Sequence, residues 1–300
     1  MPSLTVAVCT YNRPELLRKC LASLESQTAP RAAYGVLVVD NYGSDICRGV
    51  SRHYGARYVR EELKGLSHAR NRALREANTP WVLYVDDDAL AHNNLIERLL
   101  PHLADQRWAA VGGRFLHWFL EPPPPWLRLY YTDDGYRPSP ARRPTELEPP
   151  YYLVGGVLAV RTALARRVGG FDPKLGMSGG RVGYAEEDEL QDRLRRAGGR
   201  ICYDPGLVID HAVQHHKYSI ESRVEMAFAS ARDRSWPEFP DRLRGPCFLL
   251  SVLRITLLTV PYDLLRWAFR PGFYWQNAVV STGTKYAYAW GSYRNVHRRG

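Results

Sequence analysis

The sequence lacks the cysteine patterns of a disulfide framework or a zinc site. Its five cysteines are odd in number and widely spaced, and they form no CxxC pair, which is typical of reduced thiols in a cytosolic protein. The apolar stretch at the N-terminus ends at Thr10 and is too short for the core of a signal peptide. We therefore expect a cytoplasmic protein, and a peripheral position on the inner face of the cytoplasmic membrane is compatible with that expectation.

The sequence also lacks the patterns of nucleic-acid-binding proteins. Its basic residues are scattered along the chain instead of being gathered on one stripe with aromatic residues, and none of the usual motifs is present. The formal net charge of +10 suits ligands that carry phosphate, or an anionic membrane surface. We expect no nucleic acid partner.

A membrane-spanning helix needs roughly 20 apolar residues, and the apolar run at 247–260 is shorter than this. It has 14 residues, contains Arg254 and is followed by Pro261. Further on, residues 262–270 place polar and apolar side chains on opposite helical faces. We therefore expect no membrane span, and three alternatives remain for 247–270: contact with a membrane surface, with a partner, or with the protein's own core.

The N-terminal part of the chain alternates between apolar runs and amphipathic patterns. Short apolar runs rich in β-branched residues predict buried strands, and apolar residues at helical spacing predict helices between them. The expected strands lie at 4–9, 34–39, 56–59 and 81–85, and the expected helices at 15–24, 67–77 and 93–104. This alternation predicts an α/β fold with a mostly parallel central sheet flanked by helices.

A proline-rich stretch separates this part from the rest of the chain. Residues 122–150 contain many prolines and predict a loop. Ordered elements are expected again after it. They are an apolar run at 151–160, helices at 162–168 and 187–197, and strand-like segments at 200–203 and 207–209.

Three consecutive carboxylates, Asp86, Asp87 and Asp88, follow the expected strand at 81–85. The carboxyl ends of parallel strands are where such sheets bind ligands. Because adjacent carboxylates repel one another, they favour a hard divalent cation such as Mn²⁺ or Mg²⁺, held jointly with a diphosphate. The alternative is an acidic turn that caps the next helix.

Six short motifs occur in a fixed order along the chain. They are CTYNRP, VVDN, GLSHARNRAL and YVDDDA, then GGVLAVRTALARRVGGFD and EEDELQDRLRRAG. Together they resemble the family 2 glycosyltransferases, over roughly Leu4 to His211. The resemblance implies the GT-A fold of nucleotide-diphospho-sugar transferases. It also implies inverting, metal-dependent transfer from a nucleoside-diphosphate sugar, with a UDP-sugar favoured, in polysaccharide or glycoconjugate biosynthesis. The acceptor would be a hydroxyl of a saccharide or of a lipid-linked acceptor.

The resemblance assigns the nucleotide site residue by residue. Asp40 would accept a hydrogen bond from the base, although Asp and Asn also favour turns in their own right. Arg70 would face the donor's phosphates, with a surface salt bridge as the alternative. The residues placed around the base and ribose are Thr10, Tyr11, Asn12 and Arg13.

The same resemblance divides the acidic triplet between donor and metal. Asp86 and Asp87 are assigned to the donor, Asp86 to its ribose or sugar, and Asp88 is assigned to the metal. His211 matches the position of a third metal ligand, where a neutral imidazole adds no negative charge. His215 and His216 lie nearby in the sequence and are alternatives to it.

The catalytic base is assigned to Asp188, in the motif EEDELQDRLRRAG. Because the acids there are consecutive, the register is insecure by one residue and Glu187 is the alternative base. Acidic residues in a first helical turn are also favoured by the helix dipole, without any catalytic role. The glycines at 155–156 and 169–170 match acceptor-side positions of the family, and turn formation explains them as well.

The resemblance also implies a division of the chain. Residues 1–115 would form the nucleotide-sugar-binding half and 116–235 the acceptor-binding half of one GT-A domain, followed by a helical extension at 236–300. Two other functions stay open. A nucleotidyltransferase would share the strand-edge Asp and metal but needs a Gly-rich loop where this chain has TYNRP. A sugar-nucleotide-binding protein that assembles at a membrane surface would keep the fold without turnover.

Overall fold

The computed structural model describes residues 3–233 and 246–299. Its packing divides the chain into two compact units. The first contains Met1–Trp118, Asp133–Gly180 and Glu186–Ala212, and the second contains Phe119–Thr132, Arg181–Ala185 and Val213–Gly300. The functional division expected at 115 and 235 concerns donor and acceptor binding and stays a prediction.

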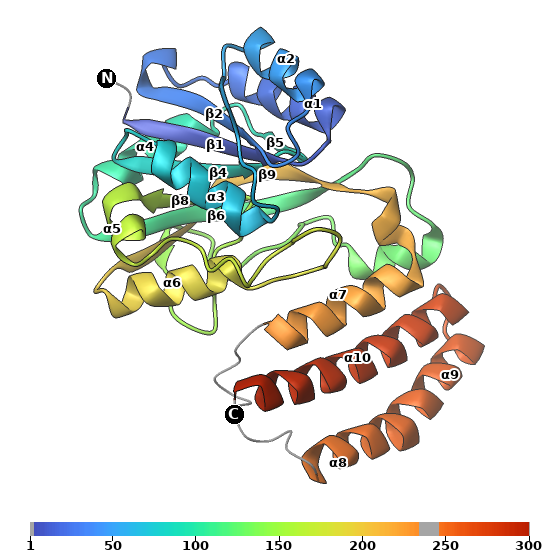
Figure 1. The fold of residues 1–300 in the computed structure, drawn as a ribbon. Helices are drawn as coiled ribbons and strands as arrows, with labels where there is room; N and C mark the ends of the chain where they lie inside the picture. The colour runs from blue at the N-terminus through green and yellow to red at the C-terminus, as the bar shows by residue number, and fades with distance from the viewer. Residues whose placement is uncertain (1–2, 234–245, 300) are drawn as a thin grey trace. The chain divides into compact units, whose positions relative to one another are not determined.

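The first unit is built around a nine-stranded sheet, in the order β3-β2-β1-β4-β8-β6-β9-β5, with β7 paired to β9. Apolar runs form its central strands, as the sequence predicts. The strands are β1 (Leu4–Thr10), β2 (Tyr34–Asp40), β3 (Arg57–Arg60), β4 (Trp81–Asp86), β5 (Ala89–Ala91), β6 (Trp108–Phe119), β7 (Thr145–Glu146), β8 (Val157–Arg161) and β9 (Arg200–Val213) (Figure 1).

The sheet is mixed rather than mostly parallel. Strands β1 to β4 pair in parallel, but β8 is antiparallel to both β4 and β6, and β9 is antiparallel to β5 and β7. Parallel neighbours need a crossover connection, whereas the chain runs from β6 to β8 without an intervening α-helix. The alternation that predicted parallel strands ends after β4.

Helices cover both faces of this sheet (Figure 1). The two faces follow from the period of the strands: Val6 and Val8 of β1 point into one apolar cluster and Ala7 into the other. The first cluster includes α1 (Pro14–Glu25), α2 (Asp45–His53) and α4 (Leu95–Ala104). The second includes α3 (Leu66–Glu76), α5 (Thr162–Arg167) and α6 (Glu186–Arg196).

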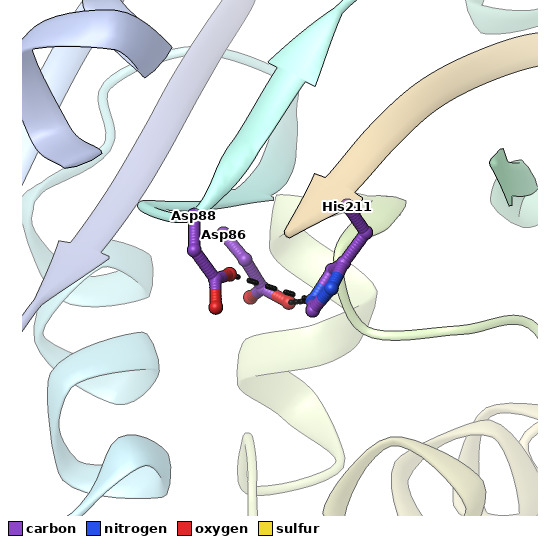
Figure 2. A group of neighbouring side chains, drawn as sticks. All are labelled: Asp86, Asp88 and His211. Atoms are coloured by element: carbon purple, nitrogen blue, oxygen red, sulfur yellow. Dashed lines mark ion pairs between the residues drawn. The ribbon is translucent and has the colours of Figure 1, made fainter. Parts of the chain in front are cut away.

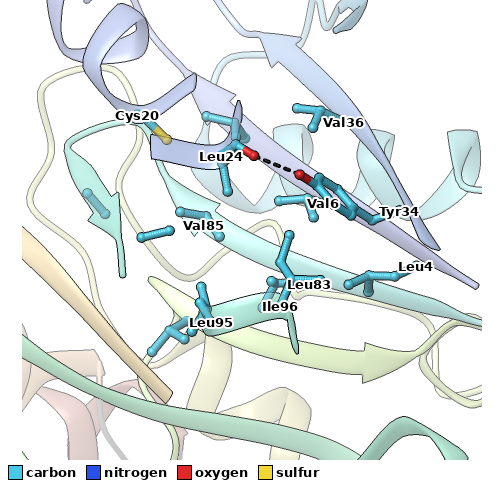
Figure 3. Packing of buried hydrophobic residues seen from close by; sticks show 14 of the residues in the cluster. Leu4, Val6, Cys20, Leu24, Tyr34, Val36, Leu83, Val85, Leu95 and Ile96 are labelled. Atoms are coloured by element: carbon cyan, nitrogen blue, oxygen red, sulfur yellow. Dashed lines mark hydrogen bonds between the residues drawn. The ribbon is translucent and has the colours of Figure 1, made fainter. Parts of the chain in front are cut away.

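The first cluster fixes α1 and α4 on the sheet. Figure 3 shows Leu24 of α1 packed near Val6, and Ile96 of α4 near Leu83. The buried hydroxyl of Tyr34 donates a hydrogen bond to the carbonyl oxygen of Leu24 at 2.8 Å. Since a buried hydroxyl needs a partner, this bond holds the end of α1 at the start of β2.

The second unit is mainly helical. Its short helix η2 (Pro125–Tyr130) contributes Trp126 to an apolar cluster with Val280, and Asn277 donates a hydrogen bond to the carbonyl oxygen of Trp126 at 2.6 Å. A further short helix, η3 (His215–Tyr218), follows β9. The longer helices are α7 (Ile220–Asp233), α8 (Pro246–Arg254), the π-helix η4 (Ile255–Thr259), α9 (Val260–Phe269) and α10 (Trp275–Arg299).

The expectation that the apolar segment is too short to span a membrane is wrong. Helices α8, η4 and α9 form one continuous helix, Pro246–Phe269, of 24 residues. The π-turn accounts for this, because the amide of Val260 bonds to the carbonyl of Ile255 and the widened turn tolerates the proline that follows. By length and composition the helix could cross a membrane: its most apolar window has a mean hydropathy of 1.6, and 11% of that window is buried.

Strand β6 approaches β9 so closely at Gly113 that a side chain does not fit. A Cβ at this position would lie 1.8 Å from the carbonyl oxygen of Leu207, whereas a Cβ at Gly35 in β2 would meet nothing within 4 Å. We expect Gly113→Ala to destabilise the protein by about 1–3 kcal/mol, as overpacked cores do. Gly35→Ala, the control, should unfold at or above the wild-type temperature. Thermal unfolding followed by circular dichroism compares the two, and an unchanged midpoint in Gly113→Ala would contradict the close approach.

Candidate active site

Two carboxylates and one imidazole meet at the carboxyl end of β4. The Nε2 atom of His211 lies 3.5 Å from Oδ2 of Asp86 and 3.4 Å from Oδ1 of Asp88. One potential ligand atom from each residue lies within 4.8 Å of the others. Figure 2 shows the three side chains converging from the end of β4 and from β9. The structure therefore brings together the predicted metal ligands Asp88 and His211, with Asp86 as a third.

Strand pairing explains why a histidine 123 positions after Asp88 in the sequence lies beside it. In the β5–β9 pair Ala89 is opposite His211, and the amide of Ala212 donates a hydrogen bond to the carbonyl oxygen of Asp88 at 2.8 Å. The backbone on either side of the site is thus held in register. The alternative ligands His215 and His216 lie in η3 of the second unit and are not part of this group.

Asp87 lies outside the group of Asp86, Asp88 and His211, and its carboxylate contacts Thr10 and Arg13. Its carboxylate accepts a hydrogen bond from the hydroxyl of Thr10 at 2.7 Å, and Nη1 of Arg13 lies 3.3 Å from Oδ1 of Asp87 and 3.4 Å from Oδ2 of Asp88. Burial, together with the charge of Asp88, raises the pKa of Asp87 to about 7. Thr10 and Arg13, assigned to the nucleotide, thus also hold the acidic turn.

Arg70 is buried between two carboxylates, with a side chain that is 3% exposed. Its Nη1 lies 2.9 Å from Oε1 of Glu186 and its Nη2 lies 3.3 Å from Oδ1 of Asp86. Burial acts to lower the pKa of Arg70, but the charges of Glu186 and Asp86 outweigh it and raise that pKa. The surface salt bridge considered for Arg70 is therefore wrong, and its contact with a donor phosphate stays a prediction.

The electrostatic balance keeps Asp86 ionised. Burial acts to raise the pKa of Asp86, but the hydrogen bond with His211 and the charge of Arg70 outweigh it and hold that pKa below its usual value. A deprotonated carboxylate is the form that ligates a metal. Asp86 is thus prepared to act as a ligand.

The glycines at 155 and 156 permit close packing around these side chains. A Cβ at Gly155 would lie 2.5 Å from Nη2 of Arg70, and a Cβ at Gly156 would lie 2.7 Å from Oδ2 of Asp86. The two glycines therefore let the backbone approach the side chains of the site itself. Whether they also approach an acceptor stays a prediction.

The second glycine pair has a structural explanation. Gly169 and Gly170 have φ values of +92° and +70°, which favour glycine. The side chain of Asn71 then accepts a hydrogen bond from the amide of Phe171 and donates one to its carbonyl, both at 2.7 Å. The turn is thereby attached to α3, the helix that carries Arg70, and turn formation accounts for these glycines.

The side chain of Asp40 stabilises the turn after β2, which is the alternative role that the sequence left open for it. Its fully buried carboxylate accepts hydrogen bonds from the amides of Tyr42, Gly43 and Ser44 and from the hydroxyl of Tyr58. Four donors occupy the lone-pair positions that a carboxylate offers. A hydrogen bond from a base to Asp40 would have to displace one of them, and this contact stays a prediction.

Two exposed tyrosines lie just past the ends of β1 and β2. The rings of Tyr11 and Tyr42 are 5.3 Å apart in an edge-to-face arrangement, and both are more than 40% exposed. Exposed aromatic side chains at the ligand-binding edge of a sheet can stack on a base. Neighbouring Asn12 has a φ of +53°, a conformation that Asn adopts more readily than most residues. Sequence reasoning assigned Tyr11 and missed Tyr42, although Tyr42 directly follows the VVDN motif.

The acids of α6 differ in their surroundings. Glu186, which sequence reasoning did not select, is buried against Arg70, while Glu187 and Asp188 are half-buried in the same first turn. Burial and the charge of Glu187 raise the pKa of Glu186 well above its ordinary value, against the effect of Arg70. The choice between Asp188 and Glu187 as base stays a prediction.

The group Asp86, Asp88 and His211 fits a divalent cation. Two carboxylates supply the hard oxygen ligands that Mn²⁺ and Mg²⁺ prefer, and a neutral imidazole completes the set. The group lies at the carboxyl end of β4, one of the parallel strands, which is where nucleotides bind in α/β folds. The site can therefore hold a metal next to a bound diphosphate.

This chain is similar to known glycosyltransferases in sequence and in fold. A relative, the succinoglycan biosynthesis protein ExoM of Rhizobium meliloti, is 26% identical over 234 residues, which are 76% of this chain and 72% of ExoM. The glycosyltransferase AglE of Haloferax volcanii is 29% identical over 119 residues, and this match spans only 39% of AglE. Mannosyltransferase PcManGT from Pyrobaculum calidifontis, solved with GDP-Man and Mn²⁺, is 22% identical. That likeness covers 95% of this chain and 87% of PcManGT with a TM-score of 0.63, so the two share a fold.

The family itself is shown by the sequence pattern. The pattern of "Glycosyl transferase family 2" matches residues 5–167, more than half of the chain. The matched part contains β1 to β4 with the acidic triplet, and β8 with the glycine pair at 155–156. This chain belongs to glycosyl transferase family 2.

Proposed function

We propose that this glycosyltransferase moves a sugar, with inversion, from a nucleoside-diphosphate sugar to the hydroxyl of a saccharide or lipid-linked acceptor at a membrane surface, and that it needs Mn²⁺ or Mg²⁺. The observation that carries the metal dependence is the meeting of Asp86, Asp88 and His211 within 4.8 Å. The family resemblance favours a UDP-sugar, whereas the structurally similar PcManGT was solved with GDP-Man. Both nucleotides therefore belong in the test.

In this proposal the chain's residues divide the work at the site. A divalent cation held by Asp86, Asp88 and His211 would supply positive charge opposite the departing diphosphate. Arg70 keeps Asp86 ionised and in place, and Tyr11 and Tyr42 offer surfaces for a base. Asp188 would take the proton of the acceptor hydroxyl as that oxygen attacks the anomeric carbon.

The two rival functions have less support. A nucleotidyltransferase would need a Gly-rich phosphate loop after β1, where this chain places Asn12 and Arg13, with Arg13 paired to Asp87 and Asp88. A binding protein without turnover would need no candidate base, whereas the first turn of α6 carries Glu187 and Asp188. The family membership also favours an enzyme.

We propose membrane contact because α9 buries polar side chains against the protein and exposes apolar ones. Asp263 is 1% exposed and pairs with Arg266 at 3.3 Å, and Arg266 lies over the ring of Phe273 at 4.0 Å. Large apolar side chains of the same continuous helix are 50–79% exposed: Leu249, Leu250, Leu253, Leu257, Leu258, Tyr262, Leu264, Leu265, Trp267 and Phe269. An exposed apolar surface of this extent indicates a membrane or protein contact. We propose a membrane surface at the cytoplasmic side, because the exposed Arg254 and Arg270 suit anionic lipids.

The metal assignment predicts the behaviour of Asp88→Ala. The affinities for UDP and for GDP are measured with and without Mn²⁺. In Asp88→Ala we expect the Mn²⁺-dependent part of each affinity to fall by about 10- to 100-fold, because a charged ligand of the metal is lost. Asp45→Ala removes an exposed carboxylate paired only with Arg48 in the described contacts and should bind as the wild type does. Titration calorimetry measures both, and full metal-dependent affinity in Asp88→Ala would refute the assignment.

The base assignment predicts a loss of rate without a loss of binding. Asp188→Asn should lower sugar transfer by roughly 10²- to 10⁴-fold while nucleotide affinity stays within about twofold, since an amide keeps the shape and loses basicity. Glu187→Gln is the matched variant one position earlier. A slow Glu187→Gln with an active Asp188→Asn would move the role to Glu187, and full activity in both would exclude this pair as the base.

The membrane proposal predicts that charge on the exposed face weakens vesicle binding. Leu257→Glu should lower co-sedimentation with vesicles of anionic phospholipid by about tenfold. Leu63→Glu is the control, because Leu63 lies in the first unit and is 60% exposed, as Leu257 is. Equal binding by Leu257→Glu and wild type would contradict contact through this helix.

A further inference from the structure

The second unit contains a groove that the proposed chemistry does not use. It lies among α7, the helix α8–η4 and α10, and has a volume of about 810 Å³. Ala227, Leu250, Ile255 and Ala289 give it apolar walls. A volume of this size is within the roughly 300–1,000 Å³ typical of small-molecule sites.

Two cations line the same groove. Arg254 and Lys285 are both exposed, and no Asp or Glu is among the described residues that line it. Hydroxyl groups of Ser251, Thr284 and Ser292 are also present. The hydroxyls of Ser251 and Thr284 donate hydrogen bonds to the carbonyl oxygens of Cys247 and Ser281. The groove therefore combines an apolar surface with two cations, which is the complement of an apolar chain that ends in phosphate.

The groove is continuous with the exposed apolar face of the Pro246–Phe269 helix. Leu250 lines the groove and is 62% exposed, and the neighbouring Leu249, which does not line it, is 66% exposed. A lipid held at a membrane by that face could thus pass into the groove without leaving an apolar environment. This continuity favours a lipid over a water-soluble ligand.

We propose that the groove binds a lipid with a single apolar chain and a phosphate group, with the chain against Leu250, Ile255 and Ala289 and the phosphate against Arg254 and Lys285. The identification of this lipid with the carrier of the acceptor rests on the proposed function. The binding of a lipid in the groove does not depend on the proposed function, because every residue of the groove lies in the second unit and the metal site lies in the first.

The first test uses farnesyl phosphate below its micellar concentration, with the full chain and no vesicles. We expect calorimetry to detect binding of farnesyl phosphate, about tenfold weaker binding of farnesol, and none of inorganic phosphate. Ser251→Trp fills the groove and should weaken farnesyl phosphate binding by about tenfold or more, whereas Leu249→Trp on the same helix should not. Equal effects of the two variants, or no binding of farnesyl phosphate to the wild type, would overturn the proposal.

A second pair of variants tests the phosphate contact. Arg254→Gln combined with Lys285→Gln should reduce the affinity for farnesyl phosphate to that for farnesol, and Arg270→Gln, an exposed arginine outside the groove, should leave it unchanged. Cys247 lines the groove and is exposed, while Cys20, Cys47 and Cys202 are buried. Farnesyl phosphate should therefore slow the modification of Cys247 by maleimide severalfold.

Failure of the groove proposal can be distinguished from failure of the proposed glycosyltransferase function. Ser251→Trp should keep Mn²⁺-dependent nucleoside diphosphate binding, which shows that the first unit of the variant folds. Retained nucleotide binding without farnesyl phosphate binding would refute the groove proposal alone. If the groove instead holds a second copy of the chain, sedimentation would show an oligomer that Ser251→Trp dissociates and that farnesyl phosphate does not affect, and that outcome too would overturn it.

Discussion

The gathering of carboxylates at the end of β4 is the constraint on which the site depends. Three consecutive acids lie at the edge of the sheet with Glu186 nearby, and buried charges without partners are strongly unfavourable. Arg13 compensates Asp87 and Asp88, Arg70 compensates Asp86 and Glu186, and His211 lies between Asp86 and Asp88. Removing one partner of such a buried pair typically destabilises a protein by about 3–5 kcal/mol. Arg70, with a side chain that is 3% exposed, is therefore needed for the fold as well as for any ligand.

The same compensation connects segments that are distant in the sequence. Arg70 comes from α3, which Asn71 ties to the turn at Phe171, and it meets Glu186 at the start of α6. The glycines at 155 and 156 leave the space that Arg70 and Asp86 occupy. A metal bound to Asp86 and Asp88 would add positive charge where acids already exceed cations, which offers a physical reason for the site to favour a divalent ion. Stability and metal binding are thus linked through shared side chains.

Sequence patterns predicted those strands that are formed by continuous apolar runs. The runs that form β1, β2 and β4 are continuous and apolar, so the strands and the acidic edge could be foreseen. Glu186 could not be selected from four consecutive acids, because only its contact with Arg70 distinguishes it. The helical extension expected at 236–300 is confirmed within the described residues, where α10 is its longest helix. The glycines of α10 permit close packing on α7, since a Cβ at Gly291 would lie 2.6 Å from the carbonyl oxygen of Phe228.

For the C-terminal helices the sequence pattern left three contacts open, and the orientation of α9 is what the pattern could not give. The sequence separates polar from apolar residues along 262–270, and such a helix normally buries its apolar side. Here Asp263 is buried, bonded to Arg266 and near Thr282 of α10, so the polar side faces the protein. Burying an ion pair while leaving leucines in water would be unfavourable on both counts. The arrangement becomes favourable when an apolar phase covers the leucines, and a membrane surface supplies such a phase.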